Sequence, residues 1–195
     1  MKGNQYFVAA ALILLGALAG ALIMGVLPGR GLNIDAAMKV AERYRDGFGD
    51  PDIEIDEVME FEYNFYVIYY EKSTGVGAFE MLIEKSTGRI YPEYGPNMMW
   101  NTKYGHGGMM SSGHMDGGTG PPTVDEAQAL AIAQEWLDGV YPGSEAEESH
   151  PFYGYYTIHT MRNGKVTGML SVNQYTGAVW YHNWHGAYIT SVETN

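Results

Sequence analysis

Two periods of apolar and polar residues alternate along the chain after residue 31. Apolar positions recur at helical spacing over 34–47 and again over 124–139, an offset of 90 residues. Asn33 and Thr123 stand at the expected N-cap positions, and acidic residues follow in the first turn of each segment. Each segment ends at a glycine. The pattern therefore predicts two amphipathic helices.

Each predicted helix is followed by three short runs of aromatic and β-branched residues with turn residues between them. The runs cover 61–70, 78–84 and 89–91 in the first half, and 153–160, 166–173 and 178–181 in the second. Asn163-Gly164 between two such runs is a strong signal for a β-hairpin. We therefore expect an α+β fold of two tandem modules, 31–96 and 122–195, each with one helix packed on a small antiparallel β-sheet.

Both halves carry short motifs that resemble the PepSY domain family. They are Ile34-Asp35-x-Ala37, 65–70 and Gly77-Ala78-Phe79-Glu80 leading to Thr87-Gly88 in the first half, and Val124-Asp125-x-Ala127 and 172–177 in the second. The resemblance implies an extracytoplasmic α+β domain. Members of the family occur in protease propeptides as inhibitory modules, and in membrane-associated proteins linked to metal or redox processes. No catalytic residues come with it.

The N-terminal segment, residues 1–30, contains 22 consecutive uncharged residues at 6–27. A helix of this length spans a hydrocarbon core of roughly 30 Å. We expect a single-pass membrane anchor with the folded part outside the cytoplasm. Ala17 and Ala19 keep a cleaved signal peptide open as an alternative. Gly16 and Gly20 form a small-residue face that is compatible with self-association.

The net charge and the lack of cysteine exclude several classes of partner and of site. The formal net charge is −12, and so acidic a chain repels phosphate backbones, which argues against a nucleic-acid partner. The sequence has no cysteine, which excludes disulfides, covalent haem attachment and thiolate zinc sites.

The connecting segment 97–121 is rich in Gly, Met and His. Its candidate metal ligands are His106, Met109, Met110, His114 and Met115. Thioether and imidazole ligands favour copper, and the glycines would let the backbone surround an ion. A flexible linker without a metal is the competing interpretation.

A second candidate metal pair, His182 and His185, follows the last predicted strand. In a turn the two imidazoles could chelate an ion, but a structural role beside the neighbouring aromatic residues fits the sequence as well. His150 and His159 lie far apart on different predicted elements, so we interpret them as structural. We also expect the acidic stretch 50–62 to form a half-exposed edge strand, and the acidic residues of 145–148 to form a solvated loop.

These observations favour a non-enzymatic protein, because no nucleophile or acid-base motif is present. The expected function is that of a membrane-anchored extracytoplasmic binding or accessory protein with a copper-binding loop. A protease-inhibitory or other protein-interaction module, and a structural subunit of a membrane complex or homo-oligomer, are the alternatives.

Overall fold

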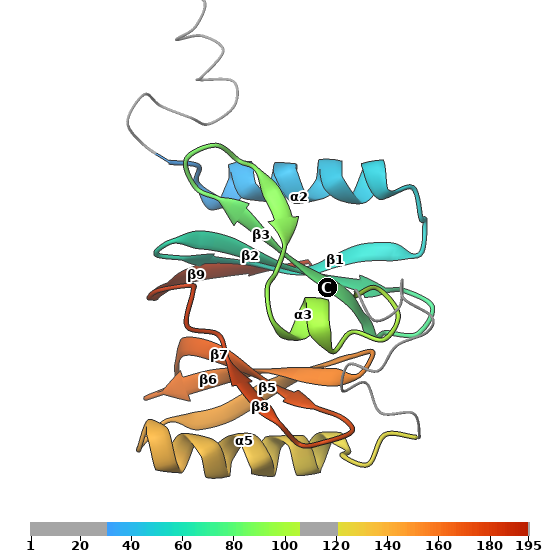
Figure 1. The fold of residues 1–195 in the computed structure, drawn as a ribbon. Helices are drawn as coiled ribbons and strands as arrows, with labels where there is room; N and C mark the ends of the chain where they lie inside the picture. Colours follow the sequence, from blue (N-terminus) through green and yellow to red (C-terminus); the bar gives the residue numbers. More distant parts are fainter. Residues whose placement is uncertain (1–30, 106–120, 195) are drawn as a thin grey trace, which may run out of the picture.

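The computed structural model describes residues 31–105 and 121–194. In this part of the chain three helices accompany nine strands, which belong to one mixed β-sheet (Figure 1). The elements are α2 (Ile34–Phe48), β1 (Ile53–Phe61), β2 (Asn64–Glu71), β3 (Gly77–Glu84), β4 (Ile90–Pro92), α3 (Pro96–Met99), α5 (Glu126–Val140), β5 (Glu145–Phe152), β6 (Tyr155–Arg162), β7 (Lys165–Asn173), β8 (Val179–Tyr181) and β9 (Tyr188–Glu193).

The strand order of the sheet is β8-β7-β6-β5-β3-β2-β1-β9, with β4 paired to β3. The prediction of two modules with separate small antiparallel sheets is therefore wrong. Two connections join the halves: β5 pairs in parallel with β3 through Gly77 and Phe152, and β9 returns from the end of the chain to pair with β1. Neither strand belonged to a predicted run, so the sequence pattern showed no link between the halves.

The described residues form four layers (Figure 1). Figure 1 shows α2 above the strands of the first half and α5 below those of the second half, with α3 beside the space between the two groups of strands. One apolar core lies under each long helix, and a third lies between the two groups of strands. Members of the three cores are Ala37, Val58 and Val67; Ala133, Leu137 and Leu170; and Met59, Tyr66 and Phe152, respectively.

Both long helices begin at side-chain caps. Asn33 Oδ1 accepts from the amide of Ala36 at 2.9 Å, which confirms the predicted cap of α2. The cap of α5 is Asp125 instead of Thr123, because Asp125 and Gln128 satisfy each other's backbone amides in a capping box. The helices also run past the predicted ends, to Phe48 and Val140.

Two acidic stretches adopt structures that differ from the predictions. β1 lies between β2 and β9 and is mostly buried, so the acidic stretch 50–62 does not form an edge strand. Residues 145–148 belong to β5 and not to a loop. Strand pairing accounts for both errors, since β1 pairs with two neighbouring strands and β5 pairs with β6 along its whole length.

The predicted membrane anchor at 6–27 and most of the predicted metal loop lie outside the described residues. Over 31–105 and 121–194, no helix is long and apolar enough to cross a membrane.

The parallel contact between β3 and β5 depends on the absence of a side chain at Gly77. A Cβ atom at Gly77 would lie 2.5–2.8 Å from three ring carbons of Phe152. We expect Gly77→Ala to destabilise the protein by about 1–3 kcal/mol, because the ring and the strand must separate. Urea denaturation of the full chain in detergent measures the effect.

Gly139→Ala in α5 is the control: nothing lies within 4 Å of the point where its Cβ atom would be, and alanine favours the helix. Equal stability of the two variants would contradict the prediction.

Candidate metal centre

The structure describes two of the metal ligands predicted from the sequence, His182 and His185. Both lie in the turn between β8 and β9. The other predicted ligands lie outside the described residues, so the copper-binding loop stays a prediction; they are His106, Met109, Met110, His114 and Met115.

A third ligand, Glu93, comes from the first half of the chain. It directly follows β4, and its amide donates to the carbonyl oxygen of Glu80 on β3 at 3.0 Å. His182 directly follows β8, and its amide donates to the carbonyl oxygen of Met169 on β7 at 3.0 Å. The ends of two short strands thus bring the carboxylate and the imidazoles together. Sequence reasoning missed Glu93 because nothing near it in the chain indicates that two histidines pack against it.

Glu93, His182 and His185 offer three ligand atoms that all lie within 4.8 Å of one another. Glu93 Oε1 lies 3.1 Å from His185 Nε2 and 3.2 Å from His182 Nδ1. All three side chains are buried. Phe61 stacks on the His185 ring at 4.6 Å between centroids, and Trp184 stacks on His182 at 4.9 Å. The apolar rings hold the imidazoles in place and keep water away.

The hydrogen bonds of His185 determine which of its nitrogens carries a proton. Asn64 Nδ2 donates to the carbonyl oxygen of Trp184 at 3.1 Å, so Asn64 Oδ1 is the atom that faces His185 Nδ1, at 2.8 Å. An amide oxygen only accepts, and therefore Nδ1 donates. In a neutral His185, Nε2 then has a lone pair that faces Glu93 Oε1 with no proton between them.

Two atoms of the cluster have no hydrogen-bond partner: Glu93 Oε2 and His182 Nδ1. His182 Nδ1 is close enough to Glu93 for an ion pair but lies outside hydrogen-bond geometry, while its Nε2 lies 3.0 Å from Ser171 Oγ. Buried polar atoms are rarely left unpaired. His182 Nδ1 and the Nε2 lone pair of His185, together with the carboxylate of Glu93, are the groups that a bound cation would use.

Burial and charge set different protonation states in the cluster. Burial alone would raise the pKa of Glu93, but the nearby His182 outweighs burial and lowers the pKa to about 2. Burial would likewise lower the pKa of His182, but Glu93 raises it above the ordinary value. Burial lowers the pKa of His185. At neutral pH, Glu93 is thus a carboxylate and His185 a neutral imidazole.

The distances in the cluster suit a transition-metal ion. With bonds of about 2.0–2.1 Å to nitrogen and oxygen, neighbouring ligands of a tetrahedral Zn²⁺ ion are about 3.3 Å apart. The separations of 3.1 and 3.2 Å from Glu93 Oε1 are close to this value. Two imidazoles and one carboxylate suit Zn²⁺, Cu²⁺ or Fe²⁺, whereas Cu⁺ prefers sulfur.

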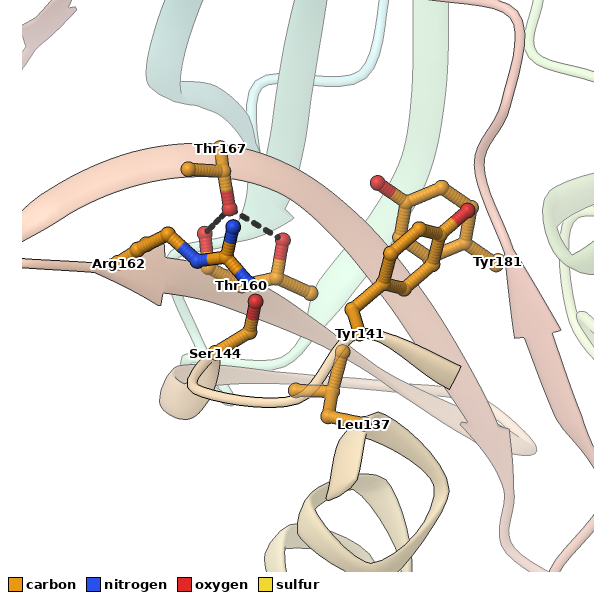
Figure 2. Close-up of a pocket in the computed structure, with 7 residues that line it drawn as sticks. All are labelled: Leu137, Tyr141, Ser144, Thr160, Arg162, Thr167 and Tyr181. Carbon is orange, nitrogen blue, oxygen red and sulfur yellow. Dashed lines mark hydrogen bonds between the residues drawn. The ribbon is translucent and has the colours of Figure 1, made fainter. Parts of the chain in front are cut away.

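Two small pockets lie in the described part of the chain. One, of about 110 Å³, lies between the end of α5 and strands β6, β7 and β8. Figure 2 shows the rings of Tyr141 and Tyr181 on one side of it and Thr160, Arg162 and Thr167 on the other. A second pocket has a volume of about 160 Å³. Sites for organic ligands usually measure roughly 300–1,000 Å³, so both of these pockets are smaller than a typical site of that kind.

No protein-family model matches the sequence, and no curated protein matches it either. Among solved structures, the chain is similar to the Bacillus megaterium YpeB C-terminal domain, with a TM-score of 0.28 and 13% sequence identity, over 77% of this chain and 62% of that one. The chain thus spans less than two thirds of that structure. A likeness this weak does not show a family.

Proposed function

We propose that this chain is a non-enzymatic, metal-binding accessory protein whose folded part holds one divalent transition-metal ion on Glu93, His182 and His185. One observation carries the proposal: His185 Nε2 and Glu93 Oε1 face each other at 3.1 Å in a buried site. An unprotonated nitrogen and a carboxylate oxygen repel each other at this distance, and a cation between them replaces the repulsion with two favourable contacts. The ligand set favours Zn²⁺ or Cu²⁺ over Cu⁺.

The sequence supports a membrane-anchored location for the metal-binding protein of this proposal. The uncharged segment 6–27 would anchor the protein in a membrane, with the folded part outside the cytoplasm. The resemblance to the PepSY family implies the same location, and some members of that family are linked to metal processes. The loop with His106 and Met109 would be a separate site for a softer ion such as copper. The protease-inhibitory and structural-subunit alternatives stay predictions.

Titration of the full chain with Co²⁺ in detergent tests the proposal, because tetrahedral Co²⁺ with nitrogen ligands absorbs visible light. The titration uses a background with His106→Ala and His114→Ala, so that the loop does not compete. The protein is refolded in the presence of the ion, since the site is buried. We expect Glu93→Gln to lose one equivalent of Co²⁺, because the substitution removes a ligand and its charge.

Glu135→Gln serves as the control, because Glu135 is an exposed residue on α5. It should bind Co²⁺ like the background protein. A background protein that binds no Co²⁺, or a Glu93→Gln variant that binds as much as the control, would overturn the proposal.

A further inference from the structure

A second group of histidine and acidic side chains lies on β1, β5 and β6. Glu57, His150 and His159 offer a carboxylate oxygen and two ring nitrogens within 4.8 Å of one another. The distance between the two histidines in the sequence predicts a structural role for them. β5 and β6 are antiparallel neighbours, however, and the two rings lie 5.2 Å apart between centroids.

Two β-bulges flank this group. The register of β1 against β2 shifts between Ile55 and Glu57, and Asp56 is the extra residue. The register of β5 against β6 shifts between Glu147 and Ser149, and Glu148 is the extra residue. Glu148 adopts a φ of 50°, which is uncommon for a residue other than glycine. Bulges redirect side chains and are frequent beside functional sites.

Each bulge carboxylate contacts the Nδ1 atom of one histidine. Glu148 Oε2 lies 2.8 Å from His159 Nδ1, and Asp56 Oδ2 lies 3.2 Å from His150 Nδ1. A carboxylate that accepts from Nδ1 fixes the ring orientation and leaves Nε2 as the nitrogen available to a metal. This is the usual arrangement around zinc-bound histidines.

The Nε2 atom of His159 has no hydrogen-bond partner, although only 2% of the side chain is exposed. It lies 3.7 Å from Glu57 Oε2, which is too long for a hydrogen bond. Because Nδ1 of His159 donates to Glu148, a neutral ring leaves Nε2 with a lone pair beside the Glu57 carboxylate.

Solvent can reach the group through His150. Its side chain is 24% exposed, and both His150 and Asp56 line the pocket of about 160 Å³. An ion could therefore enter this site without unfolding of the protein, in contrast to the buried site at Glu93.

We propose that Glu57, His150 and His159 form a second metal site, which binds a divalent ion of the Zn²⁺ type. Asp56 and Glu148 are positioning residues that orient the two imidazoles. Two nitrogens and one carboxylate oxygen match the ligands that Zn²⁺ takes in proteins. This site shares no residue with the centre at Glu93, so it stands or fails independently of that centre.

Calorimetric titration of the full chain with Zn²⁺ in detergent tests the proposal. The background carries Glu93→Gln, His106→Ala and His114→Ala, so that neither the first centre nor the loop competes. We expect one equivalent of Zn²⁺ to bind, and His150→Gln to weaken binding at least tenfold. Asp56→Asn or Glu148→Gln should weaken binding by about 10–100-fold. Glu145→Gln is the matched control, since Glu145 is an exposed residue of the same strand as His150, and it should have no effect.

A second measurement needs no substitution in the site. In a chain with ¹⁵N-labelled histidine, Zn²⁺ should shift the Nε2 resonances of His150 and His159, while their Nδ1 atoms stay protonated. Unchanged resonances would overturn the proposal, and so would a His150→Gln variant that binds Zn²⁺ as tightly as the background. If His150→Gln does not fold, the resonances decide the question.

Discussion

Replacing Glu80 with leucine is expected to lower the free energy of unfolding by about 3–5 kcal/mol. Glu80 is fully buried on β3. Its carboxyl group accepts hydrogen bonds from Tyr66, from Tyr155 at 2.8 Å and from Thr157 at 2.7 Å. Leucine would leave three buried hydroxyl groups without this partner, and each costs roughly 1–3 kcal/mol. Urea denaturation of the full chain at pH 7 measures the loss.

Glutamine at the same position distinguishes lost hydrogen bonds from lost charge. Burial and the charge of Glu93 raise the pKa of Glu80 to about 8, so Glu80 is mostly a neutral acid at pH 7. An amide of the same shape should therefore cost only about 0–1 kcal/mol. Glu135→Leu, on the exposed face of α5, should change stability by less than about 0.5 kcal/mol. A Glu80→Gln variant as unstable as Glu80→Leu would show that the carboxyl group is ionised.

Local patterns in the sequence predicted the elements better than their assembly. The cap at Asn33 and the hairpin at Asn163-Gly164 depend on residues within a few positions of one another, and both are present: Asn163 and Gly164 adopt φ values of 53° and 68°. Such turns need positive φ at both positions, which explains the signal. The sheet as a whole depends on long-range pairings, such as Gly77 with Phe152. No period in the sequence encodes those pairings.

Each candidate site likewise depends on long-range pairings that local sequence patterns do not predict. The sequence indicates His182 and His185 as a pair because they are three positions apart, whereas Glu93 comes from the opposite half of the chain. His150 and His159 are nine positions apart and meet only because β5 forms a strand beside β6. The acidic composition of β5 indicated a loop, since its mostly polar residues give no clear alternation. Pairing with β6 overrides that local preference.

Glu71, at the end of β2, is another point where distant segments meet. Its buried carboxylate accepts hydrogen bonds from Lys103 at 2.5 Å, from Tyr104, and from Tyr153 at 2.7 Å. Lys103 and Tyr104 follow α3, while Tyr153 lies between β5 and β6. Burial alone would raise the pKa of Glu71, but these hydrogen bonds outweigh it and lower the pKa to about 2.

We therefore expect Glu71→Gln to destabilise the protein by about 1–2 kcal/mol at pH 7, a value reduced because Lys103 is half exposed. Because the pKa of Glu71 is lower in the folded state, its contribution is present above the unfolded value of 4.5 and is lost as the pH falls towards 2. Urea denaturation of both proteins from pH 7 to pH 3 should show the difference shrink. Glu135→Gln should show no such trend, because Glu135 is exposed. A difference as large at pH 3 as at pH 7 would mean that the charge of Glu71 does not stabilise the fold.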